Sequence, residues 1–248
     1  MYDFNVDNYS FEISLEDIDT IVIFGSHARG ESDENSDLDL LFIIEDCDEI
    51  SYLNKKISLQ KQLDIPFEWI SLYTKNAINN MCEYGSYFLW HLKTECKIFY
   101  SKTQFLEKVL ENIKPYRNTY FDLMEYSTIC NDIRESIGFN DKTYNYELNI
   151  LASIARNTCI ALAYINNKIS FGRIQPVKTC IEDIGIDFPF NIKEYIELYN
   201  FRIVYNRKLI IPNLKPITKE YINSWVDKLE ILITRSLDIL KRGIERND

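Results

Sequence analysis

The sequence has 248 residues, of which 46% are hydrophobic and 14% aromatic, which is enough apolar material for one large domain or two small ones. The net charge of −10 is uneven: the first fifty residues hold fifteen acidic residues against one basic residue, Arg29, a net of −14 that leaves +4 for the rest. An acidic N-terminal surface repels a phosphate backbone, which argues against nucleic acid as a partner and favours a metal ion or a cationic small molecule.

The sequence also indicates where the protein is located and whether its cysteines bind metal or form disulfides. No apolar run approaches the roughly 20 residues of a membrane-spanning helix, and the N-terminus, MYDFNVDNYSFE, lacks the basic and apolar parts of a signal peptide. We therefore expect a cytoplasmic protein with no membrane partner. The six cysteines are scattered without a CxxC pair and there are two histidines, His27 and His91, so neither a zinc site nor a disulfide framework is expected.

The first hundred residues alternate strand-like and helical segments, which is typical of an α/β unit. Runs of β-branched and aromatic residues predict strands at 20–24, 36–44, 65–72 and 96–100. Helical spacing predicts helices at 49–63 and 74–95, and a short helix is expected between the first two strands. His91 lies among apolar residues of the second helix and is expected to be a packed or capping residue.

From about residue 103 the apolar residues recur at the spacing of long helices, separated by prolines and glycines. Helices are expected at 103–113, 116–137, 144–166, 175–184, 191–207 and 217–243. The sequence therefore predicts an α+β protein, in which a small mixed sheet with helices over residues 1–105 is followed by a helical bundle over residues 106–248.

Two aspartates, Asp37 and Asp39, open the predicted strand at 36–44. Residues i and i+2 of a strand face the same side, so both carboxylates can reach one divalent metal, while Leu38 and Leu40 point into the core. Two metal ions a few ångströms apart form the clamp used in phosphoryl and nucleotidyl transfer. The strand thus provides a rigid mount for metal ligands.

A glycine and a serine, Gly25 and Ser26, end the preceding strand. Such a turn lets backbone amides approach a phosphate, and the serine hydroxyl adds a donor. Ser26 precedes Asp37 by eleven residues, enough for a short helix and a return into an adjacent strand. A phosphate-binding turn and a metal mount are therefore expected to be neighbours.

A third carboxylate is expected to complete the metal site or to act as general base. Glu68 is the favoured candidate, because its strand should lie beside the strand of Asp37 and Asp39 and because desolvation beside Trp69 would raise its pKa usefully. Asp64 is the alternative.

The segment that carries these features resembles the signature of the DNA-polymerase-β-type nucleotidyltransferase superfamily. The segment reads GSHARGESDENSDLDLLF. Small bacterial members of the superfamily share the form GSxARGxxxxxSDLDL. The matching positions are Gly25, Ser26, Ala28, Arg29, Gly30, Ser36, Asp37 and Asp39. The resemblance implies that the first unit is a nucleotidyltransferase domain, that Asp37, Asp39 and a third carboxylate bind two Mg²⁺ ions, and that Gly25, Ser26, Arg29 and Ser36 contact the nucleotide.

The helical half is similar to aminoglycoside adenylyltransferases of the streptomycin/spectinomycin type, over ELNILASIARNTCIALAYINNKISFGRIQPVKTC at 147–180. In that family an arginine and a lysine of this region contact the ATP phosphates. Arg156 matches the arginine. The lysine position is shifted by extra residues, so either Arg173 or Lys178 fills it.

The resemblance implies a Mg²⁺-dependent enzyme that moves AMP from ATP to a hydroxyl of a small polar acceptor, possibly an aminoglycoside, with release of pyrophosphate. The acidic N-terminal half suits a cationic acceptor. The alternatives are adenylylation of a protein or a tRNA, as in antitoxin-type enzymes, and a non-catalytic nucleotide-binding module. The sequence is silent on the oligomeric state.

Overall fold

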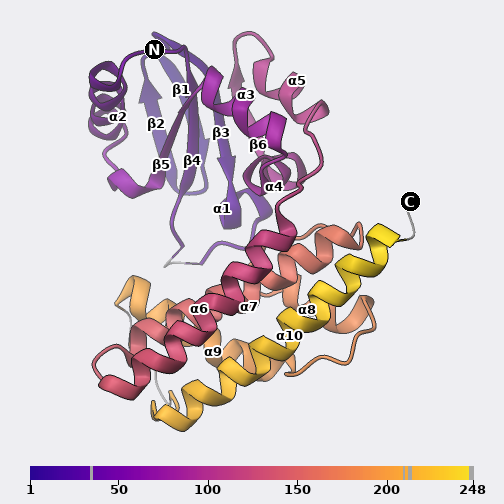
Figure 1. The fold of residues 1–248 in the computed structure, drawn as a ribbon. Helices are drawn as coiled ribbons and strands as arrows, with labels where there is room; N and C mark the ends of the chain where they lie inside the picture. Colours follow the sequence, from indigo (N-terminus) through magenta and orange to yellow (C-terminus); the bar gives the residue numbers. More distant parts are fainter. Residues whose placement is uncertain (34–35, 209, 212–213, 246–248) are drawn as a thin grey trace. The chain divides into compact units, whose positions relative to one another are not determined.

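A computed structural model describes residues 1–33, 36–208, 210–211 and 214–245 (Figure 1). It divides the chain into two compact units, Met1–Arg117 and Asn118–Asp248. The division falls later than the expected boundary at 105/106, because α5 (Phe105–Glu111) packs against α3, α4 and β3 of the first unit.

The first unit is built on a four-stranded mixed sheet with the order β5-β4-β3-β6. β3 is antiparallel to both β4 and β6, whereas β4 runs parallel to β5. Every residue of β3 is buried, since the two central strands have both faces covered. The strands are β3 (Ile18–Phe24), β4 (Asp39–Ile44), β5 (Ile70–Thr74) and β6 (Lys97–Ser101).

An N-terminal hairpin of β1 (Tyr2–Val6) and β2 (Tyr9–Ile13) was not predicted. Its apolar side chains alternate with exposed polar ones, which is the pattern of a strand with one buried face. The four buried side chains join the core beside β3; they are Phe4, Val6, Phe11 and Ile13.

Helices cover the sheet, and one of the predicted helices is divided in two. The helix predicted at 74–95 is two helices, because Gly85 ends the first with φ +74° and a Cβ there would lie 2.2 Å from the Lys114 carbonyl oxygen. The helices of this unit are α1 (Gly25–Arg29), α2 (Glu49–Leu63), α3 (Lys75–Tyr84), α4 (Tyr87–Glu95) and α5.

Two predicted strands are shorter than expected. β4 begins at Asp39, so Asp37 lies just before the strand, although Leu38 and Leu40 are fully buried as predicted. The strand predicted at 65–72 is wrong up to Trp69: Phe67–Trp69 form a single 3₁₀ turn, η1, and β5 begins at Ile70. Proline at position 66 precedes this turn.

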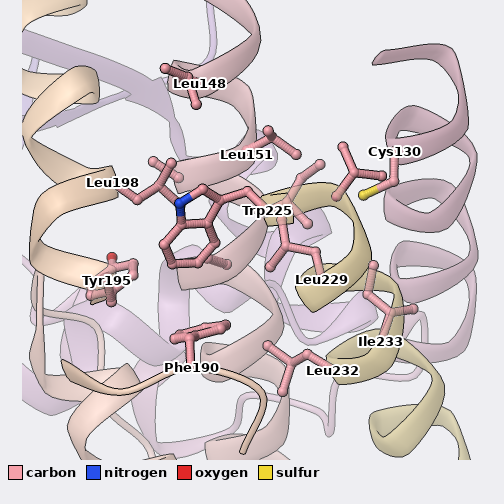
Figure 2. Close-up of a cluster of buried hydrophobic side chains, with 14 of the residues drawn as sticks. Cys130, Leu148, Leu151, Phe190, Tyr195, Leu198, Trp225, Leu229, Leu232 and Ile233 are labelled. Atoms are coloured by element: carbon pink, nitrogen blue, oxygen red, sulfur yellow. The ribbon is translucent and has the colours of Figure 1, made fainter. Parts of the chain in front are cut away.

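The second unit is a helical bundle, as predicted, of α6 (Thr119–Phe139), α7 (Tyr144–Ile165), α8 (Gln175–Asp183), α9 (Ile192–Arg207) and α10 (Lys219–Glu245). Figure 2 shows the Trp225 indole among Leu148, Leu151, Tyr195 and Leu198.

α7 is long and apolar enough to cross a membrane, with a mean hydropathy of 1.4. It packs against α6, α8, α9 and α10, and 67% of its apolar window is buried, as expected of a core helix.

Candidate active site

The turn at Gly25 and the carboxylate of Asp39 are in direct contact. Phe24, the last residue of β3, pairs with Asp39, the first residue of β4, so the turn that follows β3 stands beside the aspartate. Gly25 has φ +70°, and a Cβ at this position would lie 2.1 Å from Asp39 Oδ2. Glycine is therefore required here twice, by its backbone conformation and by the space that the carboxylate fills.

Asp39 is half-buried, and Asp37 is exposed. Burial raises the pKa of Asp39, and the negative charge of Asp37 raises it further. The two carboxylates therefore lie close enough to interact electrostatically. Nearby His91, His27 and Arg29 act in the opposite direction on the pKa of Asp39.

A histidine of the signature, His27, also lies near Asp39. Its Nδ1 donates a hydrogen bond of 2.5 Å to Asp7 Oδ2 in the turn between β1 and β2, and the Ser32 hydroxyl donates to the same oxygen at 3.3 Å. The His27 side chain is buried, and its Nε2 has no protein hydrogen-bond partner. A buried nitrogen in this condition is suited to contact a bound ligand or water.

Arg29 is held between two carboxylates. Its Nε donates to Glu31 Oε2 at 2.7 Å, and its Nη1 donates to Glu95 Oε1, which also contacts His91 Nε2. Burial alone would lower the pKa of Arg29, but the two acids outweigh it and raise the pKa. Both ion pairs fix the guanidinium group of Arg29, the residue that is predicted to contact the nucleotide.

The two predicted serine ligands differ in their surroundings. Ser26 is buried in α1, directly after Gly25. Ser36 is also buried, and its hydroxyl both donates to Asp33 Oδ1 and accepts from the Asp33 amide, each at 2.9 Å. These bonds shape the loop that leads into β4, so Ser36 supports the placement of Asp37.

The predicted third carboxylate is not gathered with the aspartates. Glu68 is exposed in η1, and Asp64 is exposed at the end of α2. Within the ranges that the structure describes, no three His, Cys, Asp or Glu side chains lie close enough together to hold a metal ion. However, Leu40 of β4 pairs with Ile70 of the parallel strand β5, so the segments that carry Asp37 and Glu68 enter the sheet at the same edge.

The donor set of the site fits magnesium. Asp37 and Asp39 offer carboxylate oxygens, the ligands that Mg²⁺ prefers, and a divalent cation would relieve the repulsion between them. The pairing of a hard cation site with a glycine turn also suits a nucleoside triphosphate, since Mg²⁺ is usually bound through one or two carboxylates and substrate phosphates.

The basic residues predicted in the helical unit make bonds within that unit. Arg156 donates to the carbonyl oxygens of Phe171 and Gly172, the latter at 3.1 Å, and so shapes the loop before α8. Arg173 is half-buried in this loop, and its carbonyl oxygen accepts from the Tyr195 hydroxyl at 2.9 Å. Lys178 is exposed, 4.0 Å from Glu182.

Sequence reasoning missed three residues that contact His27 or Arg29, or that act on Asp39. Asp7 lies in the unpredicted hairpin, Glu95 was not considered, and His91 was expected only to pack or cap. The spacing of His91 and Glu95, four residues apart on a helix, was the available signal, because such residues share one helix face.

The match to a known protein family lies within the first unit. Residues 11–105 match the family model described as Polymerase beta, Nucleotidyltransferase. No curated protein sequence matches the chain.

Two solved structures are similar to the chain. The spectinomycin adenyltransferase AAD(9) from Enterococcus faecialis, solved with ATP and spectinomycin, is 12% identical, with 88% of this chain and 92% of that chain covered and a TM-score of 0.49. A toxin-antitoxin structure with AMP-PNP is 23% identical, with 38% of this chain and 70% of that chain covered and a TM-score of 0.28. At these values neither structure assigns a substrate.

The family match covers β2 through the start of α5, including the turn, both aspartates and the whole four-stranded sheet. Residues 11–105 of the chain therefore form a nucleotidyltransferase domain of the polymerase β type.

Proposed function

We propose that the protein transfers AMP from ATP to a hydroxyl of a small polar acceptor and releases pyrophosphate. One observation carries this proposal: the Gly25 backbone lies against the Asp39 carboxylate. This contact supports a shared site for a phosphate, held by the turn, and a metal ion, held by Asp39. This is the arrangement expected of a site that grips a triphosphate and a cation together.

In this proposal each residue near the turn has a distinct task. Asp37 and Asp39 hold Mg²⁺, which supplies charge neutralisation at the phosphates when it is bound. Gly25 lets the backbone approach the triphosphate, and the Ser26 hydroxyl donates to a phosphate oxygen. Both groups are already in place in the folded chain, so little reorganisation is needed when the nucleotide binds.

The general base is proposed to be Glu68, which would take the proton of the attacking hydroxyl. Its position before β5, at the edge of the sheet that also receives Asp37, supports this choice. Asp64 is the competing candidate. We expect Glu68→Gln to lower kcat by about 100-fold and Asp64→Asn to leave it unchanged, since a positioned base contributes roughly 10²–10⁴; the reverse result would assign the role to Asp64.

The acceptor is proposed to be cationic, and an aminoglycoside fits this chemistry. The support is the charge of the first fifty residues, which contain a single basic residue. Within the first unit Arg29 is already paired with Glu31 and Glu95, so the acidic surface is little neutralised by it.

The nucleotide contacts of Arg156, Arg173 and Lys178 stay a prediction of the family resemblance. Arg156 has a second, structural task in the loop at 171–172. Arg173→Ala and Lys178→Ala are therefore the more informative variants, and a higher KM for ATP in one of them would identify the phosphate contact.

The test is transfer of label from ATP carrying a labelled α-phosphate. Purified protein is incubated with Mg²⁺ and a panel of aminoglycosides, and both pyrophosphate and labelled product are measured. We expect a labelled small molecule and loss of at least about 100-fold in rate for Asp37→Asn and Asp39→Asn. In a cell lysate, a labelled protein or tRNA would instead support a macromolecular acceptor, and ATP binding without any transfer would indicate a nucleotide-binding module.

A further inference from the structure

Three side chains of α1 and α4 form a connected network beside the turn. Glu95, the last residue of α4, accepts from Arg29 Nη1 of α1. His91, one helical turn earlier on α4, contacts the same Glu95 oxygen, Oε1. The Glu95 side chain is only 8% exposed, so this oxygen joins the two helices inside the protein.

A short helix such as α1 needs an external support. It has five residues, far fewer than the roughly 12–15 at which an isolated helix becomes even marginally stable. Arg29 has two acidic partners of different kinds. Glu31 is 59% exposed and lies in the loop directly after α1, whereas Glu95 belongs to another element and is buried. Of the two ion pairs of Arg29, the one with Glu95 therefore links α1 to another element of the unit.

The network holds the chain on both sides of the Gly25–Ser26 turn. After the turn, Arg29 is bound by Glu95. Before the turn, the ring of Phe24 packs edge-on against the ring of His91, with centroids 5.7 Å apart and an interplanar angle of 90°. His91 and Glu95 therefore contact the residues that flank the turn, while Asp39 lies against the turn itself.

We propose that Glu95, oriented by His91, is a positioning residue that holds the Gly25–Ser26 turn in the geometry that receives the triphosphate. This inference rests on the proposed function. A buried ion pair is weak as a source of stability, because desolvation of both charges offsets their attraction, but it fixes geometry well. Displacement of a site by about 1 Å can cost roughly 100-fold in rate.

The experiment compares Glu95→Gln with the matched control Glu31→Gln, since both remove a carboxylate that contacts Arg29. We measure the Kd of a non-hydrolysable ATP analogue with Mg²⁺, the turnover rate and the Tm. We expect Glu95→Gln to weaken analogue binding by about tenfold and to slow turnover, and Glu31→Gln to change both by less than about twofold.

A double-mutant cycle separates positioning from general stability. Arg29→Ala and Glu95→Ala should each weaken analogue binding, and the double variant should bind no more weakly than Arg29→Ala alone, because Glu95 acts through Arg29. If Glu95→Gln does not fold, Glu95→Asp serves in its place, since it keeps the charge but shortens the side chain, and the same weakening is expected.

The outcomes distinguish this inference from the proposed function. If Glu95→Gln lowers the Tm but binds and turns over the nucleotide like Glu31→Gln, the network is only structural and the inference is overturned. If the unaltered protein binds no ATP analogue, the proposed function itself fails.

Discussion

At the residue scale, Asp39 combines partial burial with a neighbouring negative charge, and both raise its pKa above the ordinary value of 3.8. A carboxyl whose pKa is higher in the folded than in the unfolded state binds protons more tightly when folded. Ionised Asp39 therefore costs stability at neutral pH, and stability falls as the pH rises through the range between 3.8 and the raised pKa.

We expect Asp39→Asn to raise the Tm of the metal-free protein at pH 7, because the replacement removes the buried charge. The gain should disappear well below pH 3.8, where Asp39 is protonated in both the folded and the unfolded state. Thermal unfolding in EDTA at the two pH values checks this, and a lower Tm of the variant at pH 7 would contradict it.

Gly25 and Gly30 provide a matched pair at the two ends of α1. Both have φ near +70°, where an alanine costs roughly 1–2 kcal/mol, but a Cβ at Gly30 meets nothing within 4 Å, whereas one at Gly25 meets Asp39. We expect Gly30→Ala to lose about 1 kcal/mol of stability and to keep most of the activity. Gly25→Ala should be less stable than Gly30→Ala and at least about 100-fold less active, because it displaces Asp39. If the two variants lose the same stability in denaturant unfolding and the same turnover rate, backbone strain alone accounts for both effects and the contact with Asp39 does not contribute.

At the element scale, a buried aspartate joins β3 to the surrounding segments. Asp19 is fully buried, lies 2.9 Å from Lys75 Nζ of α3, and accepts from the hydroxyls of Thr103 at 2.7 Å and Thr20 at 2.9 Å. Burial alone would raise the pKa of Asp19, but these three partners outweigh it and lower the pKa below 3.8. The stabilisation is therefore present above about pH 3.8 and is lost as the pH falls through the lowered pKa.

We expect Asp19→Ala to lower the free energy of unfolding by about 3 kcal/mol at pH 7, since it leaves two hydroxyls without their acceptor and removes the buried carboxylate partner of Lys75. The control is Glu45→Gln, because Glu45 binds the same Lys75 Nζ at 2.5 Å but is 60% exposed. Its cost should be below about 1 kcal/mol. Denaturant unfolding measures both, and similar losses would show that burial does not set the strength of the contact.

The elements that sequence analysis predicted well are those with a single strong pattern. The apolar runs of β3 and β4 and the long periodic helices of the second unit match their predicted positions to within a few residues. The missed hairpin, β1–β2, alternates polar and apolar residues over only five positions in each strand, so its signal is weak. Gly85 marked the break between α3 and α4, but the close approach of the Lys114 carbonyl that requires it comes from distant sequence.

The same reason explains which parts of the site were predictable. Gly25 and Asp39 lie close in sequence, so their spacing was sufficient to predict that they are neighbours. Glu95 and Asp7 reach the site only through folding. The apolar pattern at 65–72 predicted Glu68 in a strand, because such a pattern does not distinguish a strand from the 3₁₀ turn that forms there.

At the scale of the whole molecule, the two units have separate hydrophobic cores. The clusters of the first unit lie on the two faces of the sheet, while the cluster of the second unit is formed by its helices and contains none of the same residues. The acidic excess is concentrated in the first unit, which carries Asp37 and Asp39. Packing in the second unit can therefore be perturbed without altering the core that supports Asp39.

Trp225 offers the clearest test of this separation, because it is only 1% exposed and lies at the centre of the helical core (Figure 2). We expect Trp225→Ala to lower the free energy of unfolding of this unit by about 3–5 kcal/mol, through lost apolar contacts and the cavity that remains. Ile231→Ala on the same helix, at a side chain that is 44% exposed, should cost below about 1 kcal/mol. Hydrogen exchange should rise in Trp225→Ala across α7, α9 and α10, which pack around the indole, and stay unchanged in β3 and β4. An equal rise in the sheet would mean that the two cores unfold as one cooperative body.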